Sequence, residues 1–162
     1  MTTTQQPSSI SIALYQPDIP QNTGTILRLG ACLGVKVHII EPTGFALSDT
    51  GLKRAGMDYL ERAAMQRHRS WDAFEEWREE EGRRLVLLTT KTDQPYLSFD
   101  FKADDILLFG RESSGVPDDV HDKADHRLTI PMMEELRSIN LACSAAMVTG
   151  EALRQLGCGR AP

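Results

Sequence analysis

The stretch DDILLFGRESSGVPDDV, residues 104–120, joins an apolar run to a polar segment that contains two glycines. Residues 106–109 are Ile, Leu, Leu and Phe, a short continuous apolar run that is typical of a strand buried on both faces. Gly110 ends this run, and residues 111–117 have the composition of a tight turn. The stretch therefore predicts a buried strand with a polar loop at its carboxyl end.

Strands and helices alternate along the rest of the chain. The expected strands are residues 10–16, 36–42, 83–91, 104–110 and 126–131, with a further one around residues 63–66. The expected helices are residues 22–34, 70–82 and 140–157, with a short one in residues 50–62. Asn22 is a plausible cap for the first helix and Gly34 a plausible end. This alternation predicts an α/β fold, in which a parallel sheet has helices on both faces.

The length of 162 residues suits one domain with a sizeable core. We expect residues 10–157 to form this domain, residues 1–9 to be a disordered tail and residues 158–162 to be a C-terminal tail. Three scattered cysteines fit neither a disulfide framework nor a metal pattern, which favours a reducing cytoplasm. No apolar run approaches the length of a membrane span, and residues 1–9 do not resemble a signal peptide. The net charge of −5 means that nucleic-acid binding would need a local basic patch.

Three expected loops concentrate unusual polar and glycine residues. Ligands of an open α/β sheet bind beyond the carboxyl ends of its strands. The three loops at such ends are PDIPQNTGTILR (17–28), GRESSGVP (110–117) and IPMMEELRSIN (130–140). No strand is followed by GxGxxG, which argues against a nicotinamide cofactor, and residues 110–117 fit neither a P-loop nor the GxSxG motif. The sequence therefore indicates a ligand site of another kind.

The order and content of these loops resemble the SPOUT methyltransferases. Within that superfamily they are most similar to the SpoU group of tRNA 2′-O-methyltransferases, the TrmL-like type. The three matching segments are LYQPDIPQNTGTILR (14–28), FGRESSGVP (109–117) and IPMMEELRSINLACSAAMVTGEALRQL (130–156), with further likeness in EPTGF (41–45) and KRAGMDY (53–59). The resemblance extends over about residues 10–157 and is specific as an ordered set.

The resemblance implies a deep C-terminal trefoil knot, S-adenosylmethionine held in that knot, and a homodimer. Matched positions place Leu88, Gly110, Ile130 and Ser138 against the cofactor. Periodicity alone leaves other interpretations open. Gly110 and Gly115 could be turn glycines only, and the side chains of Leu88 and Ile130 could be plain core.

The resemblance also implies catalytic roles for Asn22, Arg28, Glu112, Ser138 and Asn140. Arg28 would fix the ribose and the adjacent phosphate, and Glu112 would order the loop. Each residue has a structural alternative: a helix cap for Asn22 and Asn140, a solvated face for Arg28, and a surface pair with Arg111 for Glu112.

RNA contacts are expected from Lys53, Arg54 and Arg137. The first two belong to a cluster with Arg62, Arg67 and Arg69 that could track phosphates or be an ordinary charged face. The chain departs from the TrmL-like pattern at Ser113-Ser114 and at Gly150, which bears on how RNA is held.

The two outer helices are the expected dimer surface, although their faces could equally pack on the chain's own sheet. The apolar and small residues that suggested this surface are Ile26, Leu29, Ala31, Cys32 and Leu33 in the first helix and Ala142, Ser144, Ala145, Ala146 and Gly150 in the last. In the family, Arg28 of one chain serves the cofactor held by the partner's Ser138.

The leading hypothesis is S-adenosylmethionine-dependent 2′-O-methylation of a tRNA nucleotide, at wobble position 34 in the anticodon region. The alternatives are another tRNA or rRNA site, or an RNA-binding protein without activity. No metal is expected, because the four histidines at positions 38, 68, 121 and 126 share no ligand spacing.

Overall fold

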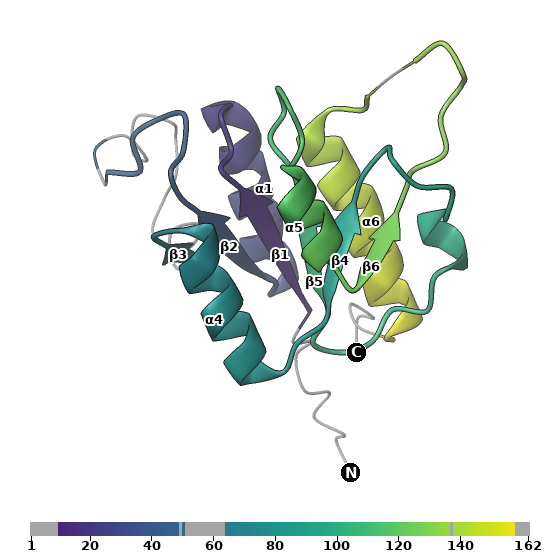
Figure 1. Ribbon diagram of the computed structural model, residues 1–162, viewed down its shortest axis with the longest axis horizontal. Helices are drawn as coiled ribbons and strands as arrows, with labels where there is room; N and C mark the ends of the chain where they lie inside the picture. Colours follow the sequence, from purple (N-terminus) through teal and green to yellow (C-terminus); the bar gives the residue numbers. More distant parts are fainter. Residues whose placement is uncertain (1–9, 49, 51–63, 137, 158–162) are drawn as a thin grey trace.

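The computed structural model describes residues 10–48, 50, 64–136 and 138–157, and it forms a three-layered α/β structure (Figure 1). The six strands are β1 (Ser11–Tyr15), β2 (Lys36–Ile40), β3 (Met65–His68), β4 (Leu85–Leu88), β5 (Ile106–Phe109) and β6 (His126–Leu128). They form one sheet in the order β3-β2-β1-β5-β4-β6, and every paired neighbour is parallel. The prediction of a parallel α/β sheet is confirmed.

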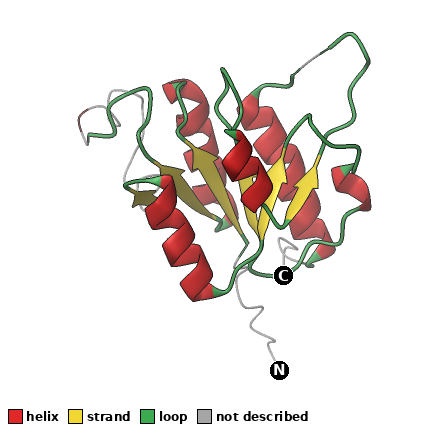
Figure 2. Ribbon diagram, viewed as in Figure 1, coloured by secondary structure: helices red, strands yellow, loops and turns green. Residues whose placement is uncertain are grey.

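Helices cover both faces of this sheet, as expected (Figure 2). On one face lie α1 (Pro20–Leu33) and α6 (Leu141–Gln155), whose apolar sides share a core with alternate residues of the strands. On the other face lie α4 (Trp71–Glu81) and α5 (Asp118–Lys123), which bury a second cluster around Phe74 and Val120. Both clusters are needed because the strands are apolar on both sides.

The helix boundaries follow local capping chemistry. Asn140 caps α6 as predicted, since its Oδ1 accepts from the backbone N–H groups of Ala142 and Cys143. Gly34 ends α1 in the left-handed conformation, with φ of 68°. The Asn22 cap was wrong: α1 begins at Pro20, with Ile19 as N-cap, because proline is favoured in the first turn. Asn22 is thereby freed for another contact.

Other differences concern short elements. The strand expected around residues 63–66 lies at Met65–His68, and the strand expected at 126–131 ends at Leu128. Two short elements were not foreseen, α5 and the 3₁₀ helix η1 (Tyr96–Ser98). The short helix expected in residues 50–62 and both tails fall almost wholly outside the described residues.

The order in which strands are added to the sheet reverses its direction at β1. The sheet grows from β1 through β2 to β3, and the later strands then add on the opposite side of β1. A crevice at the carboxyl ends of the strands is the usual ligand site of such a sheet. Among the described residues, no helix has the length and hydropathy needed to cross a membrane.

Candidate active site

A cavity of about 460 Å³ opens at the carboxyl ends of β4 and β5. It is bounded by the loops after these strands, by the start of α1 and by the segment that leads into α6. Seven residues predicted from the sequence line it: Asn22, Leu88, Gly110, Glu112, Ile130, Ser138 and Asn140. Its volume is typical of pockets that bind cofactors and other small ligands.

The loop of residues 110–116 closes on itself. Two backbone hydrogen bonds of 2.9 Å, from Arg111 N–H to Gly115 O and from Gly115 N–H to Arg111 O, form a narrow turn. A Cβ at position 110 would lie 2.6 Å from the carbonyl carbon of Gly115. Glycine is therefore required at 110 by the loop's own backbone, while its role in admitting a ligand stays a prediction.

Asp18 fastens this loop to the one that follows β1. The Asp18 N–H donates to Glu112 Oε2 over 3.1 Å, and Asp18 Oδ2 accepts from the Ser113 hydroxyl. The same oxygen lies 3.7 Å from Arg111 Nη2. The alternative of a surface pair between Glu112 and Arg111 is thus not what is observed: the nearest partner of both is Asp18.

Burial raises the pKa of the Glu112 carboxyl, and contact with the Asp18 side chain raises it further. Hydrogen bonds from the side chains of Glu112 and Ser113 hold the pKa of Asp18 below its usual value. Three polar atoms of this group, Asp18 Oδ1, Glu112 Oε1 and Arg111 Nε, are buried without a conventional hydrogen-bond partner. The cavity edge thus has hydrogen-bonding capacity that the protein itself does not use.

On the other side of the cavity, the side chains of Asn22 and Asn140 contact each other. Asn140 Nδ2 donates to Asn22 Oδ1 over 3.0 Å, while Asn140 Oδ1 caps α6. This contact ties the first turn of α1 to the first turn of α6 across 118 positions of sequence. Both predicted roles of Asn140, as a cap and as a site residue, are compatible with this geometry.

Arg28 lies apart from this group. It is exposed on α1 and does not line the cavity of its own chain. The predicted RNA-binding residues Lys53, Arg54 and Arg137 lie outside the described residues, as does Arg62. Arg67 is described, and its Nη2 lies 2.6 Å from Glu41 Oε1.

Sequence reasoning missed three side chains at the site. Lys91 and His121 line the cavity, and Asp18 organises its edge. Asp18 stood inside the quoted motif PDIPQ, but turn composition hides a specific partner. His121 Nε2 is buried without a partner, yet nothing in histidine spacing could have indicated this. Among the described residues, no group of three or more His, Cys, Asp or Glu could hold a metal ion.

This arrangement can bind a small polar ligand between backbone atoms at strand ends and the ordered loop of residues 110–116. A parallel sheet with its pocket at this loop is what the resemblance to RNA methyltransferases led us to expect. The family description "SpoU rRNA Methylase family" matches residues 9–150, and the chain belongs to this family.

Relatives make the comparison more specific. The chain is 62% identical over 146 residues to a protein of Beijerinckia indica, with 90% of this chain and 91% of the relative covered. It is 44% identical over 150 residues to a protein of Escherichia coli K12, with 91% and 94% covered. Both relatives are named tRNA (cytidine(34)-2′-O)-methyltransferase.

Solved structures agree. One described as "Structural insights into the 2-OH methylation of C/U34 on tRNA" is 40% identical with a TM-score of 0.86, covering 96% of this chain and 100% of the other. An AdoMet-bound rRNA methyltransferase from Sinorhizobium meliloti is 26% identical with a TM-score of 0.80, covering 93% of this chain and 58% of the other. The resemblance inferred from the sequence is confirmed.

Proposed function

We propose that this protein methylates the ribose 2′-oxygen of nucleotide 34 in tRNA, with S-adenosylmethionine as the methyl donor. The observation that carries the proposal is the cavity itself. It gathers seven predicted residues, six of them from three separate sequence motifs, in a chain that is 62% identical to a relative named for this reaction.

The cavity fits the cofactor in size and lining. Its 460 Å³ suits a ligand of this class, and it combines the apolar residues Leu88 and Ile130 with polar groups. Leu88 and Ile130 would act through backbone atoms, with Gly110 and Ser138 beside them. Bound S-adenosylmethionine supplies a methyl carbon activated by the positive sulfur.

The protein's task in such a reaction is alignment. The 2′-oxygen forms a bond to the methyl carbon, the carbon–sulfur bond breaks, and the 2′-hydroxyl proton is lost. Holding oxygen, carbon and sulfur in line supplies a large part of the rate enhancement. Arg28 is proposed to fix the ribose and stabilise developing negative charge on the oxygen, because a guanidinium hardly deprotonates in proteins.

Nucleoside mass spectrometry tests the proposal. Purified protein is incubated with tRNA and S-adenosylmethionine, and the tRNA is digested to locate 2′-O-methylation. We expect the product at position 34 of a subset of tRNAs. Methylation at another tRNA site or in rRNA would support the alternative target, and calorimetric binding of a nicotinamide dinucleotide but not S-adenosylmethionine would contradict the proposal.

We also propose that the active protein is a homodimer whose sites are shared. Support comes from α1 and α6, which lie side by side on the same face of the sheet and carry exposed residues. The exposed residues of these helices are Gln21, Thr25, Arg28, Cys32, Leu33, Cys143, Ala146, Met147, Gly150 and Arg154. The expected surface needs correction, because Ile26 and Ala145 are buried in the chain's own core.

The shared site explains why Arg28 lies outside the cavity of its own chain. Its test is complementation between Arg28→Ala and Ser138→Ala, each first shown to be inactive and dimeric. Mixed dimers would contain one intact site and should recover about half the wild-type activity if the two sites are independent. Purified mixed dimers that stay inactive would remove the shared-site proposal and leave the reaction standing.

We propose four further points. The segment from β6 to α6 is proposed to form the trefoil knot of the family, and residues 10–157 to be one domain. RNA binding is proposed to involve Lys53, Arg54 and Arg137. A tRNA substrate favours the cytoplasm as the location.

A further inference from the structure

The edge of the cavity brings together two carboxyl groups that come from distant parts of the sequence. Asp18 follows β1, and Glu112 lies 94 positions later, in the loop after β5. The Asp18 N–H donates to Glu112 Oε2, and each carboxyl has one buried oxygen, Asp18 Oδ1 and Glu112 Oε1, that receives no donor. Two ionised carboxylates can only accept hydrogen bonds, so a hydrogen bond between them would require a proton on one of them.

The surrounding hydrogen bonds show how the pair is held. The Asp18 N–H donates to Glu112 Oε2, and the Ser113 hydroxyl donates to Asp18 Oδ2. The remaining oxygens, Asp18 Oδ1 and Glu112 Oε1, are both buried and receive no amide, hydroxyl or guanidinium donor. A buried acceptor without a donor costs free energy, and a proton shared within the pair removes that cost.

We propose that Asp18 is a positioning residue of this site, whose carboxylate shares one proton with Glu112 and thereby holds the 110–116 loop closed against the loop after β1. The pair follows from the structure alone, whereas its consequence for catalysis rests on the proposed function. Asp18 acts through Glu112 and does not itself line the cavity.

Neighbouring charges decide which partner carries the proton. The guanidinium of Arg111 lies 3.7 Å from Asp18 Oδ2 and favours the ionised form of Asp18, so the proton belongs on Glu112. This agrees with the pKa directions, which are lowered for Asp18 and raised for Glu112. The other ionisable groups on neighbouring elements are Tyr15 on β1, Asp119 on α5, and Lys91 and His121 at the cavity.

Asp18 also connects a third loop to the site. Gly44 N–H donates to Pro17 O over 2.9 Å, and a Cβ on Gly44 would lie 2.8 Å from the Asp18 Cβ. The backbone at Asp18 is therefore fixed by the loop after β2, while its side chain fixes the loop after β5. Asp18 therefore connects the loop after β2 to the loop after β5 at the edge of the cavity.

The consequence is a pH-dependent site. A carboxyl whose folded pKa is raised stabilises the closed loop below that pKa, and this stabilisation is lost as the pH rises through it. Above that point two negative charges face each other at the cavity edge. We therefore expect the affinity for S-adenosylmethionine to fall as the pH rises through the raised pKa of Glu112.

Three variants separate this effect from general damage. Asp18→Asn replaces the shared proton by an amide donor, which suits an ionised Glu112, so affinity should no longer fall as the pH rises and should stay within about threefold of the wild-type optimum. Asp18→Ala has neither group and should lose about tenfold or more at every pH. Asp119→Asn removes one nearby negative charge outside the pair and should keep the wild-type pH profile.

Two measurements are needed. Calorimetric titration with S-adenosylmethionine from about pH 5 to about pH 9 gives the affinities. Carbon-13 NMR of the glutamate side-chain carboxyl, assigned with Glu112→Gln, reports the Glu112 titration directly in the unaltered protein. We expect a midpoint above the ordinary value of about 4.3, which falls toward that value in Asp18→Asn.

A Glu112 midpoint at the ordinary value in the wild type would overturn the shared proton. An Asp18→Asn variant that loses as much affinity as the wild type when the pH is raised would overturn the positioning role. A raised Glu112 midpoint that moves in Asp18→Asn, in a protein that does not bind S-adenosylmethionine, would support the pair and contradict the proposed function instead. The two proposals can therefore fail separately.

Discussion

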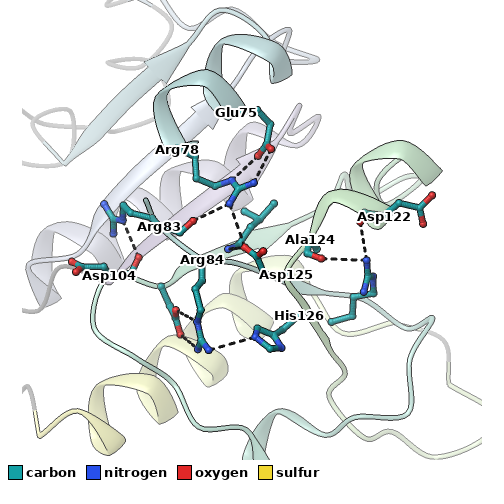
Figure 3. A network of polar contacts seen from close by, with 12 residues as sticks. Glu75, Arg78, Arg83, Arg84, Asp104, Asp122, Ala124, Asp125 and His126 are labelled. Atoms are coloured by element: carbon teal, nitrogen blue, oxygen red, sulfur yellow. Dashed lines mark hydrogen bonds and ion pairs between the residues drawn. The ribbon is translucent and has the colours of Figure 1, made fainter. Parts of the chain in front are cut away.

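Charged side chains behave differently at the two ends of the strands. We call the side of the sheet where the strands begin the amino edge, and the side where they end the carboxyl edge. At the amino edge, Arg84 donates from Nε and Nη2 to the two oxygens of Asp105, both over 2.7 Å, directly before β4 and β5 (Figure 3). Beside it, Arg78 donates twice to Glu75, and its Nη1 reaches Asp125 Oδ2 over 3.3 Å. These buried or half-buried charged groups are therefore paired with one another.

At the carboxyl edge, by contrast, comparable polar groups lack hydrogen-bond partners. Asp18 Oδ1, Arg111 Nε, Glu112 Oε1 and His121 Nε2 are all buried without a conventional partner. Four of the seven such atoms in the described part of the chain lie here, the others being Thr23 Oγ1, His38 Nε2 and Thr149 Oγ1, and a ligand or a shared proton can satisfy atoms at the cavity. The comparison assigns stability to one edge and function to the other.

The largest effect should come from breaking the amino edge. Asp105 is 1% exposed, and Asp105→Ala would leave Arg84 without its bidentate partner. Losing one member of a buried pair costs about 3 kcal/mol of unfolding free energy. Urea unfolding measures this loss, and S-adenosylmethionine affinity should be unchanged wherever the variant is folded.

The neighbouring Asp104 provides the control, because it is exposed and its Asp104→Asn variant should change stability by less than about 0.5 kcal/mol. A large loss of ligand affinity in folded Asp105→Ala would mean that the two edges are coupled, and the division proposed above would be wrong.

A second effect concerns a buried polar pair that belongs to neither edge. His38 Nδ1 and His68 Nε2 lie 2.9 Å apart on β2 and β3, beneath α4. Burial lowers the pKa of His38 to about 3, and burial also lowers that of His68. Between the folded pKa of His38 and its unfolded value of about 6.5, the unfolded chain binds more protons than the folded protein. The contribution to stability is therefore fully present above about pH 6.5 and is lost as the pH is lowered below it.

We therefore expect the protein to lose about 2 kcal/mol between pH 7 and pH 5 from His38. His38→Gln should reduce this pH-dependent loss even if it lowers stability at both values. The exposed His126 on β6 gives the matched variant, His126→Gln, whose loss should equal that of the wild type. Equal losses in all three proteins would contradict the structural role of the pair.

A third change tests the loop at the carboxyl edge without altering charge. Gly110→Ala would put a Cβ 2.6 Å from the Gly115 carbonyl carbon, so the closed turn must open. We expect about 1 to 2 kcal/mol of lost stability, together with weaker S-adenosylmethionine binding. Gly115→Ala meets no atom within 4 Å but has φ of 67°, so it isolates conformational strain, and it should retain more affinity than Gly110→Ala.

The sequence predicted the layers of the fold because they depend on local pattern. Apolar runs such as residues 106–109 reveal doubly buried strands, and Asn140 and Gly34 mark helix ends by their own chemistry. Asn22 was misassigned as a cap because its real partner, Asn140, is 118 positions away. The family resemblance still selected both as site residues.

The same limit explains what was missed at the cavity. Asp18 is significant only through Glu112, and His38 only through His68, and neither contact leaves a spacing signal. Gly110 was expected to make room for a ligand, whereas the atom nearest to its absent Cβ belongs to Gly115. Motifs identify which residues gather at a site, but tertiary contacts decide what each one does there.

The smallest change in stability is expected in α6, which covers one face of the sheet away from both strand ends. Gly150 lies inside α6, is exposed, and a Cβ there would meet no atom within 4 Å of the same chain. Alanine orders a helix interior better than glycine, so Gly150→Ala should raise the unfolding free energy by about 0.5 to 1 kcal/mol. Thermal or urea unfolding measures this gain.

The matched control is Gly34→Ala at the end of α1. Its Cβ would also meet nothing within 4 Å, but Gly34 has φ of 68°, where alanine costs about 1 kcal/mol. Because neither position is crowded, the opposite signs of the two changes isolate backbone conformation as the cause. Gly150 is one of the exposed residues of α6 that we propose as part of the dimer surface, so a partner chain could crowd it. A destabilised Gly150→Ala dimer beside a stabilised monomer at high dilution would show that crowding, whereas destabilisation at every protein concentration would contradict the prediction.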